Sequence, residues 1–124
     1  EPFCKRIGWK YDAMGVVFQS ENDKTLYIAG DTIWCDEVKE VIDKFSPSVI
    51  VINACGATKI TGGKNVTIIM DIDDVKSIAS CAKNAIIIAS HMDTVSHLTV
   101  TREDIKTLKL ENVLVPSNNE TLRF

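Results

Sequence analysis

The chain has 124 residues, of which 45% are hydrophobic and 25% are charged, and its formal net charge at pH 7 is -3. A chain of this length buries roughly two thirds of its unfolded surface around one core, so we predict a single domain over residues 1–124. The weak negative charge favours neither a nucleic-acid nor an anionic membrane partner, and no apolar run is long enough for a membrane-spanning helix.

The four cysteines, Cys4, Cys35, Cys55 and Cys81, lie far apart in the chain and form no C-x-x-C pair. A domain of this size needs no disulfides, so we expect reduced and mostly buried thiols, and with them a cytoplasmic location. The chain starts Glu-Pro-Phe-Cys, without an initiator methionine. This start is typical of a fragment or a processed end.

The first predicted elements are two short strands, residues 15–19 (GVVFQ) and 25–29 (TLYIA), joined by a polar turn-forming run. This pattern predicts a β-hairpin. The second strand ends at Gly30-Asp31-Thr32, and apolar residues at helical spacing then predict an amphipathic helix over residues 34–45.

A continuous apolar strand is predicted over residues 48–52 (SVIVI), followed by an irregular segment over residues 53–64 that holds three of the six glycines. Residues 70–81 are predicted to form a second helix. This helix is entered through Asp71, Asp73 and Asp74, which suit the positive end of a helix dipole.

The last predicted strand of the core covers residues 85–89 (AIIIA) and ends at Ser90-His91-Met92-Asp93. Thr101 and Asp104 have the spacing of a capping box that starts a short helix reaching Leu108. In the tail, residues 112–115 and 121–124 are predicted to form a closing hairpin around Pro116.

The alternation of strands and helices predicts a layered α/β arrangement, with helices covering at least one face of the sheet. Each of the three apolar strands is followed by, or ends near, a polar residue: Asp31, Asn53 and His91. If these strands are parallel neighbours, the three residues converge on one edge of the sheet, where α/β proteins place their chemistry.

An aspartate and a histidine at neighbouring strand ends can serve as metal ligands or as an acid/base pair. The alternatives are an N-cap role for Asp31 and a purely structural role for His91. His97 lies six residues beyond His91, which corresponds to about 20 Å along a strand or about 120° around a helix. Unless the chain bends between them, the two histidines cannot bind one ion.

Several segments together resemble one known family. They are GVVF from Gly15, LYIAGDTIW from Leu26, PSVIVIN from Pro47, VTIIM from Val66, IASHMD from Ile88 with His97 beyond it, and TRED from Thr101. In this order they resemble the C-terminal half of a metallo-β-lactamase-fold hydrolase, closest to the branch that includes L-ascorbate-6-phosphate lactonase. The resemblance implies an α+β fold: half of a four-layer αββα sandwich, with a mixed sheet and covering helices.

The resemblance also implies roles for three residues. Asp31 corresponds to the carboxylate that bridges two metal ions and orients the metal-bound hydroxide, and His91 corresponds to the last histidine ligand. The ions would be zinc, with manganese as the alternative, and His97 would lie near the substrate. The implied reaction is hydrolysis of an ester, lactone or similar bond in a small molecule.

The chain departs from the family in one respect. The family's His-x-His-x-Asp-His cluster belongs to the N-terminal half, and this sequence has only two histidines. Two protein ligands do not complete a zinc site, so we expect the isolated chain to be inactive and to require the missing N-terminal half or self-association. The alternative is a non-catalytic α/β binding or signalling module, although Asn53 cannot accept a phosphoryl group as an aspartate would.

Overall fold

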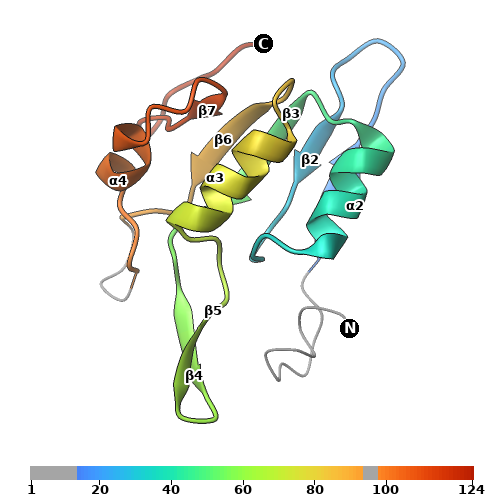
Figure 1. The fold of residues 1–124 in the computed structure, drawn as a ribbon. Helices are drawn as coiled ribbons and strands as arrows, with labels where there is room; N and C mark the ends of the chain where they lie inside the picture. The colour runs from blue at the N-terminus through green and yellow to red at the C-terminus, as the bar shows by residue number, and fades with distance from the viewer. Residues whose placement is uncertain (1–13, 94–97) are drawn as a thin grey trace.

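The computed structural model describes residues 14–93 and 98–124. Within these residues it contains a five-stranded sheet, a separate two-stranded sheet and three helices (Figure 1). In chain order the elements are β1 (Val16–Phe18), β2 (Leu26–Ile28), α2 (Asp36–Phe45), β3 (Val49–Asn53), β4 (Thr58–Thr61), β5 (Lys64–Thr67), α3 (Ile72–Cys81), β6 (Ile86–Ser90), α4 (Arg102–Thr107) and β7 (Val113–Leu114).

The main sheet is mixed and has the strand order β1-β2-β3-β6-β7. β1 is antiparallel to β2, which confirms the predicted hairpin, and β2, β3, β6 and β7 are parallel neighbours. A helix lies in each connection between these parallel strands, because the chain must run back along the sheet before the next strand can start in the same direction. The predicted α+β fold with a mixed sheet and covering helices is confirmed.

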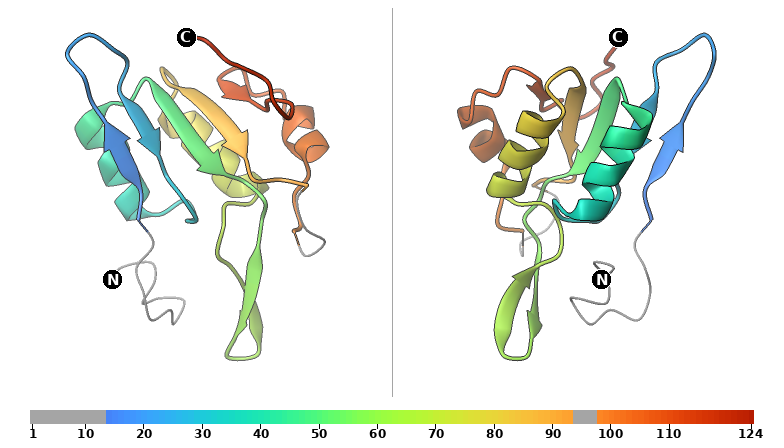
Figure 2. Two further views of the ribbon diagram at one scale, coloured as in Figure 1. Left: turned by 180° about the vertical axis from the view of Figure 1, so that it is seen from behind. Right: turned by 45° about the vertical axis from the view of Figure 1, so that its right-hand side comes forward.

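Both long helices, α2 and α3, lie on one face of this sheet (Figures 1 and 2). The core lies between the helices and the sheet, where Ile50, Ile52 and Ile87 are fully buried. The helices contribute the buried residues Val38 and Ile42 from α2 and Val75, Ile78 and Ala79 from α3. None of the helices within the described residues has the length and apolar character needed to cross a bilayer.

Local capping sets where the helices begin. Asp71 accepts hydrogen bonds from the backbone N–H groups of Asp73 and Asp74, and the Asp74 carboxylate accepts one from the Asp71 N–H. α3 therefore starts at Ile72, two residues later than predicted. The capping box predicted for Thr101 and Asp104 is confirmed at the start of α4.

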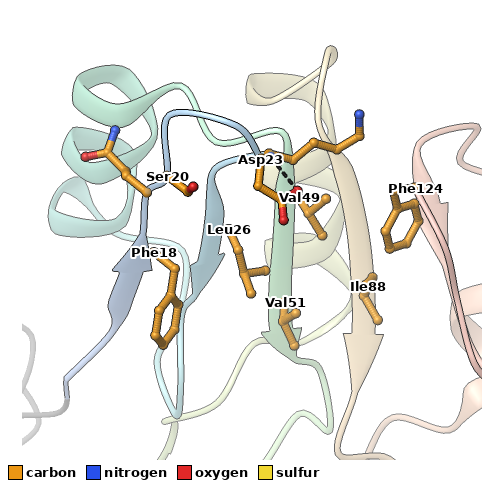
Figure 3. A pocket seen from close by; sticks show the side chains of 10 residues that line it. Phe18, Ser20, Asp23, Leu26, Val49, Val51, Ile88 and Phe124 are labelled. Carbon is orange, nitrogen blue, oxygen red and sulfur yellow. Dashed lines mark hydrogen bonds between the residues drawn. The ribbon is translucent and has the colours of Figure 1, made fainter.

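Among the residues that the structure describes, none forms a helix over the opposite face of the sheet (Figure 2). Alternate residues of the strands point to this face, and they line an open hollow of about 660 Å³ (Figure 3). Its apolar lining is Phe18, Leu26, Val49, Val51, Ile88 and Phe124. Phe18 is 54% exposed and Phe124 is 47% exposed, so an apolar surface faces solvent here.

Two predictions from the sequence are corrected. The segment predicted to be irregular contains β4 and the start of a hairpin with β5, turned at Gly62 and Gly63, which both have positive φ. The tail forms no hairpin: Val113 and Leu114 instead pair with β6, in parallel with Ile87 and Ile88. At this edge position the two residues are only partly covered, with Leu114 37% exposed, and α4 supplies the crossover that parallel pairing needs.

Candidate functional site

The ends of β2, β3 and β6 meet at one edge of the sheet, as predicted for parallel neighbours. Asn53, the last residue of β3, is the register partner of Ser90, the last residue of β6. Asp31 lies three residues beyond β2, and its Oδ1 accepts a hydrogen bond of 2.6 Å from Asn53 Nδ2. His91 follows Ser90 directly, so the residues predicted as ligands occupy ends of strands that flank β3 on its two sides.

The Asp31 turn holds the carboxylate out in solvent. Gly30 has φ +72°, and a Cβ there would approach Met14 O to 2.9 Å, so glycine suits this turn. Thr32, which follows Asp31, is buried, and its carbonyl accepts a 2.9 Å hydrogen bond from Met70 N–H. Asp31 itself is exposed.

The N-cap of α2 is Cys35, not Asp31. Cys35 has extended backbone angles and makes no side-chain cap hydrogen bond. The alternative of an N-cap role for Asp31 is therefore wrong. Its carboxylate is not used to start the helix and remains available for chemistry at the sheet edge.

The loop that carries His91 has an unusual backbone. His91 has φ +67° and Asp93 has φ +60°, in the left-handed region that non-glycine residues seldom adopt, while Met92 between them is buried. Arg102 holds this loop: its backbone N–H donates to Asp93 Oδ2 at 3.4 Å, and its Nε lies 3.5 Å from the same oxygen. Strained residues of this kind concentrate at functional sites.

Arg102 also ties the C-terminal segment to this loop. Its two terminal nitrogens donate to Pro116 O at 3.2 Å and to Asn118 Oδ1 at 2.6 Å. The planar guanidinium carries five N–H donors in a fixed fork, a geometry that the compact lysine ammonium does not have. The same side chain thus fixes both the strand-end loop and the tail.

Backbone hydrogen bonds hold the base of the β4–β5 hairpin between residues 99–100 on one side and Met70 on the other. Cys55 O accepts hydrogen bonds of 3.1 Å from the N–H groups of Thr99 and Val100, and Thr99 Oγ1 donates to Gly56 O at 2.6 Å. Gly56 N–H donates in turn to Met70 O. The hairpin itself projects away from the body of the molecule (Figure 1).

The three described cysteines form no disulfide. Cys35 and Cys55 are buried, as predicted, whereas Cys81 is exposed. Cys4 lies outside the described residues. Burial raises the pKa of the Cys55 thiol, and the Asp31 carboxylate raises it further. Burial likewise raises the pKa of Cys35. Both thiols therefore stay protonated at neutral pH, which does not suit a nucleophile.

The donor set at the edge fits part of a metal site. Carboxylate oxygen and imidazole nitrogen are common zinc ligands, and Asp31 and His91 are both exposed there. Within residues 14–93 and 98–124, no group of three or more histidine, cysteine or acidic residues could hold a metal ion. His97 lies outside the described residues.

The sequence placed Asn53 at the predicted edge but gave it no role, and it did not point to Ser90. Ser90 Oγ donates to Asn53 Oδ1 at 3.3 Å and to Ile52 O at 3.2 Å. The signal for Asn53 was present, because a polar residue closes a strand that is otherwise apolar. The signal for Ser90 was weaker, since a serine at a strand end is common.

Comparison with known proteins shows that the chain is similar to part of longer proteins. It is 35% identical over 118 residues to the UPF0173 protein YddR of Bacillus subtilis, a match that covers 91% of this chain and 45% of that protein. No family model matches the chain. The chain thus spans less than half the length of this relative.

Two solved structures match the fold. The first is a possible metal-dependent hydrolase from Veillonella parvula, with a TM-score of 0.80 and 38% identity over 90% of this chain and 44% of the other. The second is an isothiocyanate hydrolase from Delia radicum gut bacteria, with a TM-score of 0.83 and 34% identity over 92% of this chain and 44% of the other. The chain therefore has the fold of part of these two proteins, each more than twice as long as the matched region.

Proposed function

We propose that this chain is the C-terminal part of a metal-dependent hydrolase of the metallo-β-lactamase superfamily, in the branch that includes L-ascorbate-6-phosphate lactonase. The observation that carries the proposal is the placement of Asp31 and His91 at the same sheet edge, on strands to either side of β3. The similarity to a possible metal-dependent hydrolase at 38% identity supports it.

Each residue has a role in the proposed site. Asp31 would hold the metal ions through its exposed carboxylate, and His91 would bind one of them through its imidazole. Two zinc ions, or manganese in their place, would supply Lewis acidity and lower the pKa of a water molecule. The substrate would be a small molecule with an electrophilic carbon, as in an ester or lactone, and His97 is proposed to lie near it.

The ligand set in this chain is incomplete, so the isolated chain is proposed to bind metal weakly and to be inactive. Zinc sites need three or four protein ligands, and Asp31 and His91 supply two. The remaining ligands would come from a region like the part of the Bacillus subtilis protein that lies outside the match, which covers 45% of that protein.

The open face of the sheet is the proposed docking surface for that region. Phe18, Val51 and Ile88 point into the hollow on this face (Figure 3). A large apolar patch exposed to water marks an interface or a site of self-association. Packing of the missing region here would bury the patch and bring further ligands toward the sheet edge.

Metal binding tests the proposed site. Zn²⁺ affinity would be measured by calorimetry for the chain alone and for the chain mixed with the unmatched part of the Bacillus subtilis relative, supplied as a separate polypeptide. We expect weak binding alone, tighter binding and hydrolysis of a lactone or ester in the mixture, and loss of both in Asp31→Asn and His91→Ala. Glu40→Gln is the matched control, since Glu40 is exposed on α2, which lies on the other face of the sheet. Tight stoichiometric zinc and turnover by the chain alone would contradict the proposal.

Association of the two parts tests the docking surface. Val51→Asp places a charge on the open face and should prevent complex formation in size-exclusion chromatography. Ile60→Asp is the control, because Ile60 is 72% exposed but lies on the β4–β5 hairpin, away from this face. Equal association of both variants would argue against docking at the open face, and dimers of the chain alone would favour self-association instead.

A further inference from the structure

Three polar side chains form a continuous hydrogen-bonded chain across the ends of three strands. The Ser90 hydroxyl has one hydrogen, which it shares between Ile52 O at 3.2 Å and Asn53 Oδ1 at 3.3 Å, and Asn53 Nδ2 donates to Asp31 Oδ1. A carboxylate only accepts hydrogen bonds, so the Asn53 amide must turn its NH₂ group toward Asp31. Its carbonyl oxygen then faces β6, where the Ser90 hydroxyl meets it. Both ends of the amide are therefore used.

The three residues differ in how firmly the backbone holds them. Asn53 and Ser90 are register partners in neighbouring parallel strands, and the next residue, Ala54, donates its N–H to Ser90 O at 3.0 Å. Asp31 lies in a turn beyond β2 and is exposed. A side chain on a turn has more conformational freedom than one on a strand that is paired with its neighbours. The orientation of the Asp31 carboxylate is thus set by residues on the strands.

The hydrogen bond between Asn53 and Asp31 has the geometry expected of a strong contact. At 2.6 Å it is short for an N–H···O bond, and one partner is an ionised carboxylate, which strengthens such bonds about twofold. Because Asn53 is neutral, it orients the carboxylate without competing for a cation. An aspartate at this position would repel Asp31 instead.

We infer that Asn53 and Ser90 are positioning residues that hold the Asp31 carboxylate at the sheet edge. This inference rests on the proposed metal-binding role of Asp31. With Oδ1 bonded to Asn53, the other carboxylate oxygen is left to face an ion. Since Ser90 is joined directly to His91, the same chain of hydrogen bonds also sets the spacing between the two proposed ligands.

Outer partners of metal ligands matter because they fix the ligand's direction before the ion arrives. Removing such a partner costs about 10–100-fold in metal affinity in known sites. A residue that only stabilised the fold would lower the melting temperature without changing affinity in the folded fraction. The two roles are therefore separable by measurement.

The experiment is ¹⁵N NMR on the chain of residues 1–124, titrated with Zn²⁺ alone. Asn53→Ala should weaken Zn²⁺ binding about 10–100-fold, followed through the His91 backbone signal. Ser90→Ala should weaken it less, and Ser90→Thr, which keeps the hydroxyl, should restore it. Asn84→Ala is the matched control, since Asn84 is exposed in the loop before β6 at the other edge of the sheet. Thermal unfolding of each variant identifies any that do not fold.

The same spectra test the hydrogen bond without metal. In the metal-free chain, Asp31→Ala should shift the side-chain NH₂ signals of Asn53, and an unchanged position would overturn the inference. If Asp31→Ala abolishes Zn²⁺ binding while Asn53→Ala and Ser90→Ala bind like the parent chain, the positioning role is wrong and the proposed function stands. If Asp31→Ala leaves Zn²⁺ binding unchanged, the proposed function is wrong and the inference falls with it.

Discussion

Replacing Gly56 with alanine tests how the base of the β4–β5 hairpin packs against the segment after the His91 loop. Gly56 has φ +62°, and a Cβ would lie 2.4 Å from Thr99 Oγ1 and 2.6 Å from Val100 Cγ2. The left-handed backbone costs a non-glycine residue roughly 1–2 kcal/mol, and overpacking costs a further ~1–3 kcal/mol. We expect Gly56→Ala to lower the free energy of unfolding by about 2–5 kcal/mol.

A second glycine of the same hairpin separates the two contributions. Gly63 has φ +76°, but a Cβ there would meet no atom within 4 Å. Gly63→Ala should therefore cost only the backbone part, about 1–2 kcal/mol. Both variants would be measured by urea unfolding followed by circular dichroism. Equal losses in the two variants would refute the close packing of Thr99 and Val100 on Gly56.

Three further predictions concern the helix caps and Arg102. Hydrogen bonds from Thr101 lower the pKa of Asp104 in the folded chain. The Asp104 carboxylate therefore adds to the free energy of unfolding above the usual aspartate pKa, and this stabilisation is lost as the pH falls through the lowered value. Asp104→Asn should accordingly destabilise the chain at neutral pH and have little effect in acid, in urea unfolding followed across the pH range. Burial raises the pKa of Asp74 in the folded chain. Protonated Asp74 therefore adds to the free energy of unfolding below the usual aspartate pKa, and this stabilisation is lost as the pH rises through the raised value. Asp74→Asn should remove that loss, and a parallel pH profile in parent and variant would contradict the assignment. Arg102→Ala should cost about 1–3 kcal/mol of unfolding free energy and speed hydrogen exchange at Asn118, with Arg102→Lys intermediate; unchanged exchange in both would show that Arg102 does not hold the tail.

Features decided within a few residues were predictable from the sequence. The capping box at Thr101 was identified because the side chain and the backbone groups that it bonds lie three residues apart. The β1–β2 hairpin was identified because its polar turn lies between two apolar strands. The β4–β5 hairpin was missed, although Gly62-Gly63 is a strong signal for a two-residue turn with positive φ. That error came from treating a glycine-rich segment as a loop.

The tail was beyond what local pattern could decide. Val113 and Leu114 would suit either strand of a hairpin or the edge of a parallel sheet. Their pairing with Ile87 and Ile88 depends on α4 returning the chain to the free edge of β6. Such a choice is made by the packing of distant segments, which a short stretch of sequence does not record.

The site shows the same division. The pattern of apolar runs is enough to place Asp31, Asn53 and His91 at or just past the ends of strands. The order of the strands emerges only in the folded chain, where β3 lies between β2 and β6 and Asp31 meets Asn53 across 22 positions of sequence. The fold also places Cys35, and not Asp31, at the N-cap of α2. Strand order and side-chain contacts arise from non-local packing, because the same alternation of strands and helices is compatible with several orders in the sheet.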